Sequence, residues 1–147
     1  MVIVDPEWQY TSLGRSVGAG GLSLRTRDFM NLATLFVRAG NFNGQRILPA
    51  EWLQRSMTTH VEATNGQEYG YLIWKSRHEI GGRGIVANFM SGNGGNRVVF
   101  IPELELVIVI TKTDYGRQDA HEQSERLMLN ILQRFLGGQA LSTTPNK

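Results

Sequence analysis

The sequence predicts an α+β fold, in which helices pack on one antiparallel sheet of about four strands. The prediction rests first on two apolar runs, 97–101 and 106–111, which are separated by four residues. A connection this short joins antiparallel neighbours. Second, apolar residues recur at helical spacing from Leu127 to Leu136, which gives a helix one broad apolar face. Third, both runs are apolar at consecutive positions, so we expect helices to cover both faces of the sheet.

The N-terminal third is expected to begin as a loop and then to form two helices. Residues 1–21 have no helical periodicity and are expected to be extended. The first helix has Thr26 as its expected N-cap and ends at Gly40. Pro49 suits the first position of a second, short helix that ends near Met57. The apolar side chains that we expect these helices to bury are Phe29, Leu32, Ala33, Phe36, Trp52 and Leu53.

The middle of the chain contains the expected strands. Aromatic and β-branched residues predict the first strand over 69–74. A second candidate, 84–90, follows a turn made of two glycines, and the runs 97–101 and 106–111 complete the sheet.

The C-terminal helix is the clearest element in the sequence. It is expected to start at Asp119, because Glu122 stands three residues later in the manner of a capping box. A pair of glycines at 137 and 138 predicts its end. Residues 1–138 are therefore expected to form a single domain, and the polar tail 139–147 is expected to be disordered.

Composition excludes several classes of function. The chain has 147 residues, 41% of them hydrophobic, and it has no cysteine, which excludes thiol catalysis and cysteine-ligated metal. No apolar run reaches the roughly 18 residues of a membrane span. Twelve arginines and three lysines are scattered rather than clustered, which argues against nucleic-acid binding.

The three histidines lack metal-ligand spacing, so we expect neither metal nor cofactor. No signal peptide is visible at the start, and the compartment stays open.

A run of small residues, Ser91-Gly92-Asn93-Gly94-Gly95-Asn96, interrupts a predicted strand pair. Glycine at such a place marks either a structural bulge or the close approach of a ligand. A hydroxyl nucleophile with an adjacent base is not evident. No serine satisfies Gly-x-Ser-x-Gly or Ser-x-x-Lys, since Ser12 is followed by Arg15 and arginine cannot act as the base.

Several segments follow one another in an order that resembles the C-terminal part of the serine β-lactamase-related hydrolases. That family includes class C β-lactamases, D-alanyl-D-alanine peptidases, family VIII-type esterases and nylon-oligomer hydrolases. The resemblance covers roughly residues 18 to 136. The segments are Ala-Gly-Gly-Leu-Ser at 19–23, Thr-Arg-Asp-Phe at 26–29, Gly-Gln-Arg-Ile-Leu-Pro-Ala-Glu-Trp at 44–52, Tyr-Gly-Tyr at 69–71, the small-residue run at 91–96, and Ile-Pro-Glu-Leu-Glu-Leu-Val at 101–107.

The resemblance implies a reaction that uses three motifs, and this chain has only one of them. In such enzymes a Ser-x-x-Lys supplies the nucleophile and the base, a Tyr-x-Asn or Ser-x-Asn flanks them, and a Lys-Thr-Gly-like strand donates a backbone N–H to the oxyanion. The first two motifs are absent from the sequence, so no catalytic residue is expected here. The third is expected in a lysine-free form, with Ser91, Gly92, Asn93 and Gly94 as the oxyanion-side strand.

Three aromatic residues, Tyr69, Tyr71 and Trp74, could form a wall of the same cleft, and the alternative is that they are ordinary sheet-packing aromatics. The resemblance leads us to expect a C-terminal portion of a serine hydrolase that acts on esters, amides or β-lactams and is inactive alone. A small-molecule or peptide substrate would then bind only with the missing N-terminal half. The alternative is a non-catalytic module of the same fold that binds a peptide or an acyl group or serves as a scaffold.

Strands that need cover on both faces would leave apolar surface exposed if the rest of such an enzyme were absent. We therefore expect the chain to form homo-oligomers or to pair with a second chain.

Overall fold

A computed structural model describes residues 1–18, 20–63 and 66–142. The first part of the chain holds the paired strands β1 (Glu7–Trp8) and β2 (Leu22–Ser23) and the helix α1 (Thr26–Val37). The hairpin of β3 (Asn41–Phe42) and β4 (Gln45–Arg46) and the helix α2 (Ala50–Met57) follow. Within these described ranges, no helix is long and apolar enough to cross a membrane.

The main sheet has six strands, all antiparallel, in the order β10-β9-β8-β7-β6-β5. Its strands are β5 (Val61–Glu62), β6 (Glu68–Tyr69), β7 (Trp74–Ile80), β8 (Arg83–Gly92), β9 (Asn96–Ile101) and β10 (Leu106–Ile110). Two short 3-10 helices, Asn93–Gly95 and Pro102–Leu104, join the last three strands. The α+β class is as expected, but the sheet has six strands rather than about four, because the short strands β5 and β6 and the mostly polar β7 lack a hydrophobic pattern. The strands predicted at 84–90, 97–101 and 106–111 are confirmed within two residues at each end.

The strand predicted over 69–74 is wrong. Strand β6 ends at Tyr69, and the next residues form a turn in which Leu72 has a φ of 57°. The turn is held against the end of α2, where the Tyr71 N–H donates to the Ser56 carbonyl at 3.0 Å. The true strand, β7, follows this turn. Its residues Trp-Lys-Ser-Arg-His-Glu-Ile are mostly polar, and for that reason the hydrophobic pattern does not reveal it.

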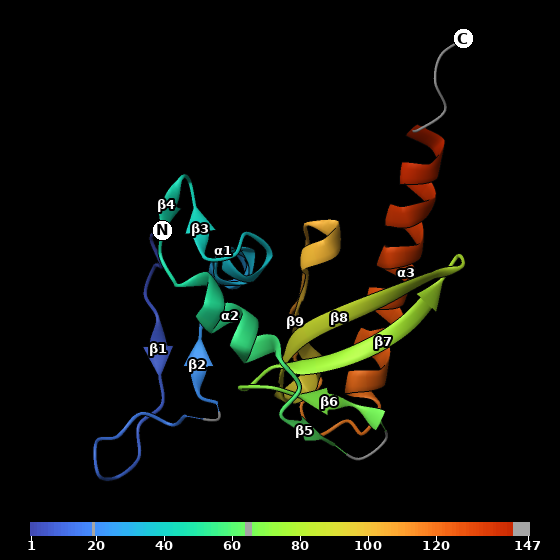
Figure 1. Cartoon of the computed structure of the whole chain (residues 1–147). Coiled ribbons are helices and arrows are strands. Elements are labelled where there is room, and N and C mark those ends of the chain that lie inside the picture. The colour runs from blue at the N-terminus through green and yellow to red at the C-terminus, as the bar shows by residue number, and fades with distance from the viewer. Residues whose placement is uncertain (19, 64–65, 143–147) are drawn as a thin grey trace.

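The sheet is covered on both faces, as the consecutive apolar residues predicted. Alternate residues of β8, β9 and β10 pack against Met128 and Leu132 of α3 (Ala120–Ser142). The other residues of β9 and β10 pack against α1, where Phe36 stacks on Phe100 with ring centroids 4.4 Å apart. Figure 1 shows α3 along one side of the sheet and α1 and α2 on the other. Because the side chains of a strand alternate between faces, each apolar run supplies two cores.

The helix ends depart from the expectations in detail. Thr26 is the first residue of α1, and Arg25 is its N-cap without a side-chain bond. In α2 the side chain of Leu53 is buried, whereas Trp52 is 52% exposed and is not part of the core. Helix α3 passes through the glycine pair and ends at Ser142, so the predicted stop at 137–138 is wrong and residues 139–142 of the expected tail are helical. The remainder of that tail, 143–147, lies outside the described residues.

Candidate functional site

The oxyanion-side strand expected from the sequence lies at the end of β8. Strand β7 pairs with β8 only as far as Trp74 opposite Phe89. Beyond that pair, Ser91 and Gly92 are paired with β9, opposite Arg97 and Asn96. Along the described chain, the end of β8 therefore has one edge bonded to β9 and one edge without a strand partner.

The glycines that follow are needed for packing. Gly94 and Gly95 have φ values of 75° and 83° and are both buried. A Cβ on Gly95 would lie 2.6 Å from the carbonyl oxygen of Ala120, at the start of α3. The Ser124 hydroxyl donates to the Gly95 carbonyl at 2.6 Å, which ties this turn to α3. Gly95 therefore allows the turn to approach the helix closely, and Gly94 leaves room for the Tyr115 ring, which would lie 3.0 Å from a Cβ there.

The amides of the run are not equivalent. The Gly94 N–H donates to the Asn93 side-chain oxygen at 2.8 Å, so this amide is already used within the turn. Asn96 fixes the other side of the turn: its amide donates to the carbonyls of Asn93 and Lys112, and its oxygen accepts from the Lys112 N–H. Of the four expected residues, Ser91, Gly92 and Asn93 border an open groove, whereas Gly94 lies beneath Tyr115.

The groove has a volume of about 540 Å³ and lies between the end of β8 and the first turns of α3. Ser91 Oγ lies 3.4 Å from His121 Nδ1 across it. The residues that line it are Gln67, Trp74, Phe89, Ser91, Gly92, Asn93, Arg97, His121, Glu122 and Glu125.

The structure brings only one of the three expected aromatic residues to this groove. Trp74 lines it, and Tyr69 packs on Trp74 with ring centroids 4.5 Å apart. Tyr71 lies elsewhere, stacked on His60 at 4.3 Å and near Trp52 of α2.

Sequence reasoning missed Arg97, the most buried charged group at the groove. Its side chain is 4% exposed, stacks on the Phe89 ring at 4.4 Å, and lies 3.8 Å from the Glu125 carboxylate. Its Nε has no hydrogen-bond partner among the described residues. Burial lowers the pKa of Arg97 from its usual value, and Glu125 opposes that effect. The signal available in the sequence was an arginine at the head of a strand that is otherwise apolar.

Burial also lowers the pKa of His78, which the Arg97 charge lowers further and Glu125 raises. The groove thus brings together the buried Arg97, the Glu122 and Glu125 carboxylates of α3, and the Ser91 hydroxyl beside the His121 imidazole. In the ranges described, no group of three or more His, Asp and Glu side chains is placed to hold a metal ion.

Comparison with known proteins gives a match in structure alone. No protein-family model matches the chain, and no curated protein matches it. One matching solved structure is named "Putative 6-aminohexanoate-dimer hydrolase from Bacillus anthracis", with a TM-score of 0.68 and 18% identity over 89% of this chain. The chain covers 34% of that structure, about a third of its length. At this identity the likeness shows the fold alone, which resembles one part of that structure.

Proposed function

We propose that this chain is the C-terminal portion of a β-lactamase-like serine hydrolase, which transfers an acyl group from an ester, amide or β-lactam to water. The observation that carries the proposal is the end of β8. This strand continues past β7 through Met90, Ser91 and Gly92, where one of its edges has no strand partner among the described residues, and Ser91 and Gly92 line the groove.

An extended substrate can bind such an edge as an added strand. An oxyanion hole needs an N–H about 2.7 to 3.1 Å from the developing charge, which small residues on the rim permit. Because the Gly94 N–H is bonded to Asn93, the donor in our proposal is the amide of Ser91, Gly92 or Asn93.

The nucleophile and the base would come from another part of the protein. The sequence has no Ser-x-x-Lys, and the chain spans about a third of the hydrolase structure that it matches. One oxyanion donor supplies only about 2.7 to 4 kcal/mol of barrier reduction. We therefore expect the chain by itself to be inactive.

The first experiment compares the chain alone with a polypeptide in which a segment carrying Ser-x-x-Lys and Tyr-x-Asn precedes it in the same reading frame. We expect the longer protein, and not the chain, to hydrolyse a nitrophenyl ester or a chromogenic cephalosporin and to react with a fluorophosphonate. Labelling of a serine within the chain alone would contradict the proposal. A gene that has no such segment would favour the non-catalytic module.

Single proline substitutions at 91, 92 and 93 in the active protein identify the donor. Proline removes an N–H, and on a strand it is tolerated only where that N–H faces away from the ladder. We expect one of the three variants to keep its melting temperature and to lose roughly 10²- to 10³-fold in kcat. If no folded variant loses activity, the end of β8 is not the oxyanion strand.

A further inference from the structure

The groove at the end of β8 contains a carboxylate without a partner, and this charge bears on the substrates that the groove can bind. Glu122 and Glu125 line the groove from the first two turns of α3, and Arg97 lines it from β9. Glu125 lies 3.8 Å from the Arg97 guanidinium, so these two charges offset each other. Glu122 is exposed, and it forms no ion pair with any residue that the structure describes.

The N-terminus of α3 offsets this charge only in part. A helix N-terminus carries about half a positive elementary charge. Asp119 stands just before the helix, but its carboxylate accepts bonds from Arg117 at 3.0 and 3.1 Å, so these two charges cancel. Because His121 also lines the groove, the balance is taken at a pH above the range in which imidazoles titrate. The groove beside Glu122 then keeps about half a negative charge.

Arg97 has its counter-charge but lacks a hydrogen-bond acceptor. Its side chain is 4% exposed, and its Nε has no hydrogen-bond partner among the described residues. Glu125, at 3.8 Å, is too distant for a hydrogen bond. A buried N–H without an acceptor is costly, so the guanidinium suits an oxygen atom of a ligand. A ligand carboxylate would add a third negative charge beside Glu122 and Glu125, and a neutral oxygen therefore suits the position better.

The groove also offers apolar surface. Trp74 lines it from the start of β7, and an indole ring packs against aliphatic chains and attracts ammonium groups to its face. Phe89 lines it as well, beneath the Arg97 guanidinium at 4.4 Å. The volume of about 540 Å³ is within the range of small-molecule sites, so a short aliphatic chain fits.

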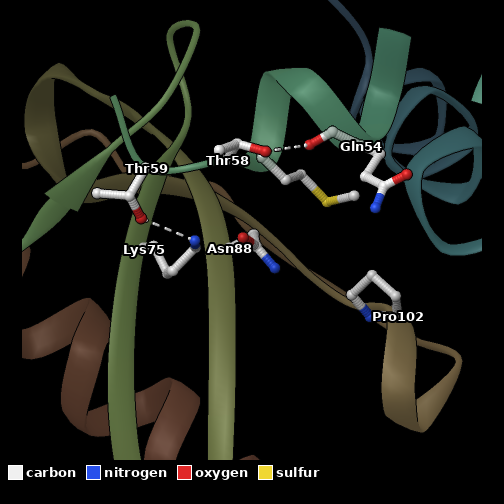
Figure 2. Close-up of a pocket in the computed structure, with 7 residues that line it drawn as sticks. Gln54, Thr58, Thr59, Lys75, Asn88 and Pro102 are labelled. Atoms are coloured by element: carbon white, nitrogen blue, oxygen red, sulfur yellow. Dashed lines mark hydrogen bonds between the residues drawn. The ribbon is translucent and has the colours of Figure 1, made fainter. Parts of the chain in front are cut away.

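A second hollow, of about 480 Å³, lies on the face of the sheet opposite α3 and differs in its charge. Figure 2 shows Lys75 and Asn88 on the strands that line it. The charged residue of this lining is Lys75, which donates to Thr59 Oγ1 at 3.0 Å and lies 3.6 Å from the Glu68 carboxylate. Because Lys75 already has these partners, the charge that is left for a ligand is that of Glu122 in the groove.

From this arrangement we infer that the groove binds acyl substrates that carry an ammonium group and excludes those that carry a carboxylate. The ammonium lies at Glu122, the aliphatic chain packs against Trp74, and a neutral oxygen other than the reacting carbonyl lies at Arg97. Among the esters, amides and β-lactams of the proposed hydrolase, cationic esters and amides are favoured over β-lactams and peptides with a free carboxylate. The inference rests on the proposed function, because it names the substrate class of the same groove.

The first test measures binding to the chain alone and needs no catalysis. The probe is 5-(trimethylammonio)pentanamide at low salt and about pH 8.5, and NMR follows the carbon-bound protons of Ser91 and Gly92. We expect saturable shifts with this cation. Binding should be at least about threefold weaker for the uncharged 6,6-dimethylheptanamide, and the anionic monoamide of adipic acid should give no saturable shift.

Charge variants at position 122 identify the carboxylate. Glu122→Gln should bind the cation and its uncharged analogue equally, and Glu122→Lys should bind the adipic acid monoamide more tightly than the cation. Glu103→Gln removes an exposed carboxylate from the 3-10 helix Pro102–Leu104, and this matched control should keep the preference for the cation. The inference is overturned if the cation gives no saturable shift, or if Glu122→Gln and Glu103→Gln show the same preference.

The second test uses the active longer protein. The 4-nitrophenyl ester of 5-(trimethylammonio)pentanoate should have a kcat/KM at least about threefold above that of the mono-4-nitrophenyl ester of adipic acid. The chromogenic cephalosporin, which carries a carboxylate, should be a poorer substrate than the cationic ester. Glu122→Gln should raise the KM for the cationic ester and leave kcat unchanged.

The two proposals fail separately. Equal kcat/KM values for the two esters in an active protein would contradict the charge selection alone. Cation-selective binding by the chain, together with an inactive longer protein, would support the charge selection and contradict the hydrolase.

Discussion

At the scale of single residues, Gly95 is the position where the turn after β8 has the least room. Its φ is 83°, and a Cβ would lie 2.6 Å from the Ala120 carbonyl oxygen. We expect Gly95→Ala to lower the free energy of unfolding by at least about 2 kcal/mol, through strain and steric contact together. Gly44→Ala is the control, since Gly44 also has a positive φ of 79° but has no atom within 4 Å of a Cβ.

Urea denaturation of the two glycine variants provides the measurement. The control should lose only the conformational cost of about 1 kcal/mol. Equal losses in the two variants would show that the contact with α3 does not limit this turn.

Glu68 gives the fold a dependence on pH. Its hydrogen bonds from Arg77 and Thr59 lower its pKa from 4.5 to about 2. A carboxylate whose pKa is lowered by folding stabilises the folded state above its unfolded pKa, and this contribution is lost as the pH falls from 4.5 towards 2. The melting temperature should therefore fall across this range.

The matched variant for this pH dependence is Glu68→Gln, which keeps the shape of the side chain and removes its titration. Its melting temperature should start lower at neutral pH and fall less steeply in acid. A smaller decline should remain, because hydrogen bonds from Arg117 and Gln123 also lower the pKa of Asp119. Parallel curves for the two proteins would contradict the assignment to Glu68.

At the scale of elements, α3 is held to the sheet by a narrow set of its apolar residues. Met128 and Leu132 are fully buried against the sheet, whereas Leu127 is 46% exposed. We expect Met128→Ala to cost about 2 to 5 kcal/mol, because it leaves a cavity in the core. Leu127→Ala should cost less than about 1 kcal/mol. Thermal and urea unfolding provide the measurement. If Met128→Ala and Leu127→Ala lower the free energy of unfolding equally, α3 packs on a different face.

The arrangement of the elements also explains which parts of the groove could be predicted from the sequence. The small-residue run lies at the end of β8, where a Cβ on Gly95 would meet the Ala120 carbonyl of α3. The groove itself joins Trp74, Ser91 and Arg97, which lie on three strands, to residues of α3. The sequence does not contain the pairing of these strands, so Arg97 and His121 could not be assigned to the groove in advance.

At the scale of the whole molecule, several large apolar side chains remain exposed, and one edge of the main sheet is the apolar strand β10. An unpaired apolar edge favours pairing with another chain. We propose that the chain dimerises or pairs with a second polypeptide. Light scattering should give a mass above the 16.5 kDa of one chain, and an apolar dye should bind to any remaining monomer. A clean monomer that binds no dye would contradict this.

The sequence by itself determined the fold class, the strands after residue 83, the turn at Gly81 and Gly82 and the cover on both faces. These features depend on local periodicity and on the backbone freedom of glycine, which act over a few residues. The tertiary structure alone decided that 69–74 is a turn, that the polar segment 74–80 is a strand, and that Asn88 and Arg97 are buried. A polar residue is buried at such a position because a neighbouring strand and a helix cover it, and the covering helix lies far from it along the chain.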